Sequence, residues 1–527
     1  MDEPNGGGAT VMANITDRLS RAIVLQEELQ QFADHLSCIY ADYFQQVPTQ
    51  IYTSLNNDIR AEISSLRKIE KEFESGGDLA SHRARSSNLP FYEALWDTAK
   101  RSKEIVLLQY AVSSSAYSKQ ILAPGNRIVR SFGQSRPSKD CHIIIDIVAD
   151  GGQSWWKVSS TTNKRLIFDM AREAVFCGDS SDDEDEEAEE EAIGVLLSDD
   201  ADIPLIKLAK NLATAARGYR IRTKSPIPYL VLPRMVEGSH PKIDMVLNTC
   251  RKLGVNIICG NSLSPAPALS AQLLGTMAPS PKANFSETLN IDTSVLVGLV
   301  SDFSHSQVPK HPWFRRSHLD HAELESKQSA VSLFYPILGT HPMVCAKEAE
   351  QTFRHIVNTI GTEDEKARAD CLIWGDSQWS REQRLEKLQS LSIHSVPPGL
   401  QLPVQVVGFK ENDEESQLSK TAKEKTNFLH NPGRSVFLYG WMSQQTTLTC
   451  NSVAVKELEK QLETLTSLGE KDWPSIWTFP TSRPLVGTPP PAGGHKRARK
   501  HIGDCSVKCT CGVQELYGHQ GDVTILL

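Results

Sequence analysis

Residues 289–300 have the sequence LNIDTSVLVGLV, in which a single acidic residue divides two apolar runs. The first run has the length of a short buried strand ending at Asp292, and the second is long enough for a helix. Thr293 or Ser294 is suited to cap that helix, because a side-chain oxygen there accepts a hydrogen bond from a free backbone N–H. The pattern predicts a strand followed directly by a helix, which is typical of a parallel α/β sheet.

Asp292 stands where open α/β sheets bind ligands, at the carboxyl end of a parallel strand. An acid before a helix is also a common capping residue, and the local sequence favours that simpler interpretation. A second pattern of the same kind follows: Pro342–Ala346 reads as a strand, and the helix after it has Glu348 and Glu350 in its first turn. Acids in this position interact favourably with the helix dipole.

The functional alternative joins the two patterns. One of the two glutamates would lie beside Asp292, because parallel strands end at the same edge of a sheet. Hard divalent cations such as Mg²⁺ prefer oxygen ligands, and carboxylates supply them. Acids that converge on such an ion activate water and stabilise the leaving oxygen in phosphodiester hydrolysis. Asp292 with Glu348 or Glu350 is therefore a candidate metal site.

The rest of the 527-residue chain predicts further folding units. Residues 9–112 are rich in helix formers, and apolar residues recur at helical spacing from Ile63 to Phe73, so we expect a helical bundle that serves for packing or dimerisation. Residues 141–260 alternate strands with helices, which predicts a central module of parallel α/β order. A stretch rich in Ser, Ala and Pro then precedes a further domain at 288–487.

The charge is unevenly distributed. The formal net charge is −8, but the run 182–191 alone supplies nine acids, within an insertion at 179–200 that we expect to be disordered. The overall acidity is thus local and does not argue against a polyanionic substrate. We expect residues 488–527 to form a disordered tail that contains the basic run 495–500. This run has two interpretations: a functional segment, as a nuclear-import signal or a nucleic-acid tether, and a solvated segment without a function.

The cysteines and the hydropathy bear on the compartment. Eleven cysteines are scattered without a disulfide framework, so we expect a reducing, intracellular environment, cytoplasmic or nuclear. No apolar run approaches the roughly 18 to 20 residues that a membrane helix needs, so no membrane partner is expected.

The chain closely resembles a family known as domain of unknown function 1308. The resemblance rests on segments of the central module (145–152, 202–205, 230–238 and 253–260) and of the last domain (290–294 and 344–361). It extends over roughly residues 20–487 apart from the acidic insertion. Its members are eukaryotic proteins with a helical amino-terminal domain and a PIN-like carboxyl-terminal domain, and they imply an α/β/α fold with a mostly parallel sheet for residues 288–487.

PIN-like domains are similar to ribonucleases that hold Mg²⁺ or Mn²⁺ with three or four acids. By this resemblance Asp292 matches the first acid and Glu348 the second, with Glu350 as a further metal ligand. Glu365 or Asp370 would be an alternative. The third motif departs from the family pattern, because an expected apolar strand at 436–440 leads into Trp441, where an acid should stand.

Two hypotheses follow from that departure. A Trp cannot coordinate a hard cation, so either the metal site is incomplete or an exon boundary in the translated sequence is wrong. The leading hypothesis is a metal-dependent ribonuclease in which Asp292 and Glu348 are catalytic and RNA is the substrate. The alternative is a catalytically inactive PIN-like scaffold that binds RNA, or a protein partner through its amino-terminal helices.

Overall fold

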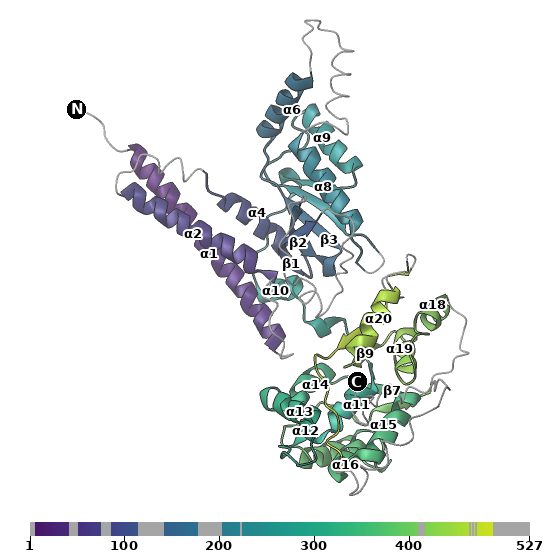
Figure 1. Cartoon of the computed structure of the whole chain (residues 1–527). Coiled ribbons are helices and arrows are strands. Elements are labelled where there is room, and N and C mark those ends of the chain that lie inside the picture. Colours follow the sequence, from purple (N-terminus) through teal and green to yellow (C-terminus); the bar gives the residue numbers. More distant parts are fainter. Residues whose placement is uncertain are drawn as a thin grey trace, which may run out of the picture. The chain divides into compact units, whose positions relative to one another are not determined.

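The computed structural model describes residues 6–41, 51–74, 86–113, 142–177, 203–221, 224–408, 417–462, 465, 468–469 and 472–488. The chain forms two compact units, and the division between them falls after Ser280. Both units combine helices with a β-sheet (Figure 1). The predicted insertion at 179–200 lies outside the described residues, as does the predicted tail from residue 489 onward.

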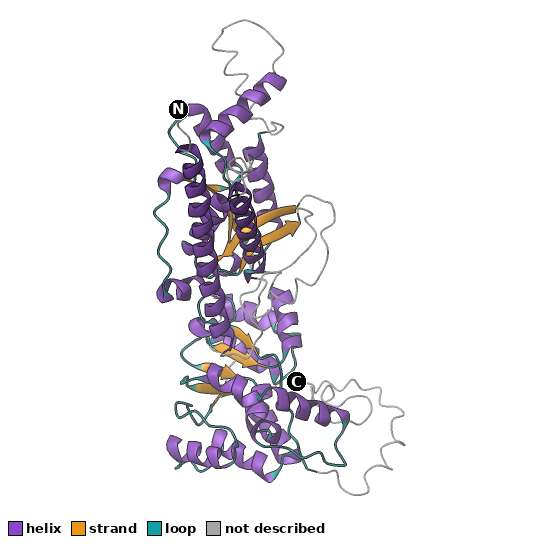
Figure 2. Ribbon diagram, turned by 90° about the vertical axis from the view of Figure 1, so that its left-hand side faces the viewer, coloured by secondary structure: helices purple, strands orange, loops and turns teal. Residues whose placement is uncertain are grey.

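The first unit begins with three helices, α1 (Gly6–Ala41), α2 (Thr53–Glu74) and α4 (Leu89–Lys100). Figures 1 and 2 show α1 and α2 running alongside each other. The apolar stripe predicted on residues 63–73 is the inner face of α2, where Ile69 and Phe73 pack against Ile15 of α1. Trp96 of α4 is fully buried and donates its indole N–H to Glu28 over 2.7 Å.

A five-stranded sheet completes the first unit. Its strands lie in chain order and comprise β1 (Leu107–Ser113), β2 (His142–Ala149), β3 (Ser154–Val158), β4 (Ile227–Leu232) and β5 (Asn256–Cys259). The pairs β1–β2 and β2–β3 are antiparallel, whereas β4 and β5 run parallel to β3. Helices α6 (Asn163–Cys177), α8 (Pro204–Gly218), α9 (Pro241–Lys252) and α10 (Ala271–Met277) complete the unit.

Two expectations for this unit were wrong. Residues 107–112 belong to strand β1, not to the helical bundle, because Leu107 and Val112 are buried in the core of the sheet. The module is also not wholly parallel. Only residues 150–153 separate β2 from β3, with positive φ at Asp150, Gly151 and Gly152, and so short a connection makes an antiparallel hairpin, not a parallel crossover.

The second unit contains a wholly parallel sheet, in the order β10-β9-β6-β7-β8. Its strands are β6 (Leu289–Ile291), β7 (Met343–Ala346), β8 (Gln405–Val407), β9 (Thr446–Thr449) and β10 (Ile476–Thr478). Helices flank this sheet, so the predicted α/β class with a carboxyl-terminal parallel sheet is confirmed. The chain moves outward from β6 to β7 and β8 and then crosses to β9 and β10 on the other side of β6.

The helix that follows β6 is the centre of this unit. All eight residues of α11 (Thr293–Val300) are buried, and a Cβ added at Gly298 would stand only 2.8 Å from the ring of Phe334, so the close packing requires glycine. The other helices of the unit are α12 (Asp302–His305), α13 (Arg316–Lys327), α14 (Ala330–Leu338), α15 (Lys347–Ile360), α16 (Glu363–Leu372), α17 (Arg381–Ser390), α18 (Gln417–Lys425), α19 (Gly433–Met442) and α20 (Ser452–Leu462).

Within the described ranges, no helix is both long enough and apolar enough to span a membrane.

Candidate functional site

Asp292 follows the central strand of the parallel sheet. β6 pairs with β7 on one side and with β9 on the other. After β6 the chain adds β7 and β8 on one side of the sheet and then β9 and β10 on the other, so the order of the strands reverses at β6. Such a reversal of strand order leaves a crevice outside the carboxyl ends of the strands, where α/β sheets bind ligands. Asp292 is therefore at the position that the fold itself favours for a site.

The Asp292 carboxylate is buried and held by two hydroxyls. Its Oδ2 accepts hydrogen bonds from Ser294 Oγ over 2.5 Å and from Thr449 Oγ1 over 2.7 Å. Burial raises the pKa of the Asp292 carboxyl above its usual value, and these two hydrogen bonds oppose that rise because they stabilise the charged form. Asp292 does stand directly before the first turn of α11, as a capping residue would. Its carboxylate is also bound to Thr449 at the end of a neighbouring strand, so capping alone does not describe its role.

Thr449 is the contact that the sequence did not reveal. It ends β9, which is 157 residues away from Asp292 in the chain and adjacent to β6 in the sheet. Its Oγ1 also accepts from the backbone N–H of Asn451 over 2.9 Å, while Ser294 Oγ accepts from the backbone N–H of Cys450 over 2.9 Å. The end of β9 is thus held against the beginning of α11 by the hydrogen bonds from Thr449 to Asp292 and from Cys450 to Ser294.

Asn451 comes directly after this set, at the start of α20. Its Oδ1 accepts from the backbone N–H of Ala454 over 3.0 Å, which is the bond of a helix-capping residue. An amide, not a carboxylate, therefore follows β9 beside the Asp292 contact.

Glu348 contributes the second carboxylate. It lies in the first turn of α15, directly after β7, and its Oε2 is buried without a hydrogen-bond partner among the described residues. The two helix starts are in contact, because Thr293 Oγ1 donates to the backbone oxygen of Ala349 over 3.3 Å. A buried carboxylate oxygen that lacks a partner is costly unless a proton or a cation satisfies it.

Glu350 makes different contacts. Its Oε1 accepts from Trp374 Nε1 over 2.6 Å and from Arg354 Nε over 2.7 Å, and Arg354 also lies over the Trp374 ring at 4.5 Å. This carboxylate is therefore already neutralised by an arginine on its own helix. Of the two glutamates proposed as metal ligands, Glu348 is the one with a buried carboxylate oxygen that lacks a partner among the described residues.

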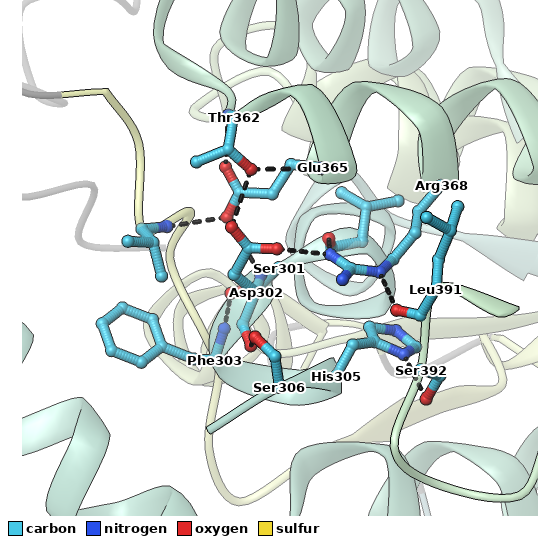
Figure 3. Close-up of polar contacts among 12 residues, drawn as sticks. Ser301, Asp302, Phe303, His305, Ser306, Thr362, Glu365, Arg368, Leu391 and Ser392 are labelled. Carbon is cyan, nitrogen blue, oxygen red and sulfur yellow. Dashed lines mark hydrogen bonds and ion pairs between the residues drawn. The ribbon is translucent and has the colours of Figure 1, made fainter. Parts of the chain in front are cut away.

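Glu365 is also fully buried, in a separate polar network that Figure 3 shows. Its carboxylate accepts from the backbone N–H groups of Asp302, Thr362 and Val486 over 2.8 to 3.0 Å. Burial raises the pKa of the Glu365 carboxyl, and these three N–H groups oppose the rise. It therefore fixes α12 and α16 to the carboxyl-terminal segment. For Asp370 the structure gives only a backbone contact, in which its carbonyl oxygen accepts from Arg384.

Arg368 is the cation of this network. It is 1% exposed and donates to Asp302 Oδ1 over 2.7 Å, to the Val300 carbonyl over 3.0 Å and to the Leu391 carbonyl over 2.9 Å. His305 lies beside it, and burial followed by the charge of Arg368 lowers the pKa of His305 to about 3. Because α11 separates this network from Asp292, the network anchors the far end of the helix that begins at the candidate site.

Trp441 does not occupy a strand end, and here the sequence-based expectation was wrong. The apolar residues 436–440 belong to helix α19, and Trp441 packs in a hydrophobic cluster with Phe437 and Leu458. Its indole N–H donates to the carbonyl of Asp472 over 2.7 Å. A short apolar run looks the same in a buried helix and in a buried strand, and here it lies within helix α19. The strand that follows it and pairs with β6 is β9, which ends at Thr449.

The described residues contain no group of three or more His, Cys, Asp or Glu side chains arranged to hold a metal ion. The donor set at the sheet edge consists of two carboxylates, Asp292 and Glu348, with the hydroxyls of Ser294 and Thr449 beside the first. Two carboxylates, one of them with an unpartnered buried oxygen, would suit a single hard cation, because Mg²⁺ is commonly bound through one or two carboxylates and completes its shell with water.

Residues 289–392 match the family described as "Protein of unknown function (DUF1308)". The match begins at the first residue of β6, so the DUF1308 segment contains Asp292, Glu348, Glu350 and Glu365. Strands β9 and β10 follow it. No curated protein and no solved structure matched the chain.

The resemblance drawn from the sequence is therefore supported across the DUF1308 segment. Thr449, which holds Asp292, lies outside that segment, so the site combines a residue of the matched region with one from a later strand.

Proposed function

We propose that the second unit is a PIN-like domain that binds one divalent cation, Mg²⁺ or Mn²⁺, through Asp292 and Glu348 and acts on the phosphodiester backbone of RNA. The observation that carries this proposal is the buried, unpartnered Oε2 of Glu348 at the same sheet edge as Asp292. A cation would satisfy that oxygen and would lower the cost of keeping the buried Asp292 ionised.

Each residue would have a distinct role. Ser294 and Thr449 hold Asp292 Oδ2, and this would fix the carboxylate as the first ligand of the cation. Glu348, at the start of α15, would supply the second ligand. When bound, the cation would polarise the phosphodiester and lower the pKa of a coordinated water. The protein would function in the cytoplasm or the nucleus, where RNA is present.

A second candidate function is a non-catalytic scaffold of the same fold, with RNA or a protein as its partner. The observation that favours it is Asn451, because the residue beside Thr449 at the end of β9 is an amide that caps α20 and adds no third carboxylate to the site. In this case the two carboxylates would hold a cation, or a proton, for structural purposes only.

Cleavage of end-labelled single-stranded RNA by the purified chain in Mn²⁺ separates the two candidates. The proposal expects cleavage that is lost in EDTA and in Asp292→Asn, and that is retained in Asp364→Asn, which makes the same change at an exposed acid of α16. Cleavage that persists in Asp292→Asn would reject the site. Folded protein that binds Mn²⁺ without cleaving RNA would favour the scaffold.

A further inference from the structure

The first unit contains a groove of about 510 Å³ along its two longest helices. Gln26 of α1 lines one side, and α2 contributes Arg60, Ile63, Arg67, Lys68 and Lys71. We call this feature the basic groove, because the described residues that line it include four cationic side chains and no Asp or Glu.

The sequence of α2 places these cations together. Positions 60, 67, 68 and 71 fall within about 100° of arc on a helix of 3.6 residues per turn. The apolar positions Leu55, Ile59, Ile63, Leu66 and Ile69 form the buried stripe of the same helix. The helix is therefore amphipathic, with an inner apolar face and a flank on which these four cations gather.

The charge of this flank is largely uncompensated. Arg60, Arg67 and Lys68 are exposed and make no hydrogen bond or ion pair within the described part of the chain. Other cations of the same helical region behave differently: Arg21 pairs with Asp17 and Glu93. Like charges on neighbouring turns destabilise a helix slightly, so an anionic partner would stabilise α2.

The spacing and the lining indicate the kind of anion. The cations extend over residues 60–71, or roughly 16 Å of helix, which is long enough to contact several successive phosphates of one strand. None of the described residues that line the groove is aromatic, so this lining offers no surface on which bases could stack. A lipid surface is also a poor fit, because a membrane-binding helix presents an apolar face, whereas Ile63 is only 4% exposed.

We propose that the basic groove binds the phosphate backbone of RNA without reading its bases. The choice of RNA over another nucleic acid rests on the function proposed for the second unit; the polyanionic character of the ligand follows from the groove alone. It is a second site, in a different unit from Asp292 and independent of any cation.

The test uses the full chain, a fluorescent single-stranded RNA and fluorescence anisotropy in EDTA, so that neither cleavage nor a metal contributes. One variant changes Arg60, Arg67, Lys68 and Lys71 to Gln. A matched control changes four exposed cations outside the groove, two arginines and two lysines, to Gln: Lys164, Arg172, Arg220 and Lys252. Circular dichroism establishes that both variants are folded.

The expected result is a loss of RNA affinity of at least tenfold in the groove variant and little change in the control. The slope of log K against log salt should become shallower by about 3, because each phosphate contact contributes roughly 0.7 for a single strand. Equal affinities of the groove variant and the wild type, or an equal loss in the control, would overturn the proposal. Binding of the wild type to phosphatidylserine vesicles or to polyglutamate but not to RNA would overturn it as well.

The outcome is separable from that of the proposed function. Asp292→Asn should retain full RNA affinity in EDTA if the groove binds RNA. Conversely, Mn²⁺-dependent cleavage by a groove variant with unchanged affinity would reject the groove and leave the catalytic proposal intact.

Discussion

Substitution of Arg368 by Met should destabilise the second unit strongly. Arg368 is 1% exposed and donates hydrogen bonds to one carboxylate and two carbonyls, whereas Met fills a similar volume without donors. Removal of one partner from a buried ion pair costs about 3 to 5 kcal/mol. Asp302 retains the hydroxyl of Thr362 at 2.7 Å and is 15% exposed, so we expect the lower end, about 3 kcal/mol.

Hydrogen exchange of the full chain measures this loss locally. A decrease of about 3 kcal/mol in the opening free energy corresponds to exchange that is roughly 150-fold faster in peptides from α11, α12 and α16. Peptides from β4 in the first unit provide an internal reference. Lys366→Met is the matched control on the same helix: its partner Glu363 is 90% exposed, and a surface pair of this kind contributes at most about 1 kcal/mol.

Two results would refute this reasoning. If Arg368→Met and Lys366→Met accelerate exchange equally, the network does not stabilise the end of α11. If Arg368→Met leaves the fold intact but abolishes binding of Mn²⁺, the network belongs to the functional site and Glu365 must be reconsidered as a ligand.

Three further predictions concern neighbouring groups. Glu350→Gln should destabilise the protein by about 1 to 2 kcal/mol in urea unfolding, because it weakens the pair with Arg354. The same variant should keep its Mn²⁺ affinity within about twofold of the wild type. A complete loss of Mn²⁺ binding would identify Glu350 as a ligand. The free energy of unfolding should fall as the pH drops from the unfolded-state pKa of His305 near 6.5 towards about 3, because the unfolded state binds the proton first. The fall should reach up to about 1.4 kcal/mol per pH unit. His305→Gln should flatten it in pH-dependent urea titrations. Asn451→Asp should keep the cap on α20, because Asp and Asn are both good capping residues. It should raise the Mn²⁺ affinity in calorimetric titration by about tenfold or more, because it adds a carboxylate beside Thr449. An unchanged affinity would mean that residue 451 is too far from the ion to bind it.

The sequence predicted local features of the second unit well. The change at Asp292 from a short apolar run to a longer one correctly located β6 and α11, and the acids after β7 correctly located the start of α15. These features depend on residues close together in the chain, where strand length and capping chemistry determine the outcome.

Contacts between distant residues could not be predicted in the same way. The bond from Thr449 to Asp292 joins residues 157 positions apart, and only the pairing of β6 with β9 brings them together. Residues 436–440 read as a strand because a short apolar run has no distinctive period, yet they lie within helix α19. The different surroundings of Glu348 and Glu350 likewise depend on Arg354 and Trp374, which no local pattern connects.

Binding of Mn²⁺ to the purified chain, followed by electron paramagnetic resonance, tests the two-carboxylate site most directly. The account predicts one tight ion per chain, lost in Asp292→Asn and in Glu348→Gln but kept in Asp364→Asn and Glu386→Gln, which alter exposed acids of α16 and α17. Tight binding that survives both site substitutions, or the absence of any tight ion in folded wild-type protein, would contradict the proposed metal site.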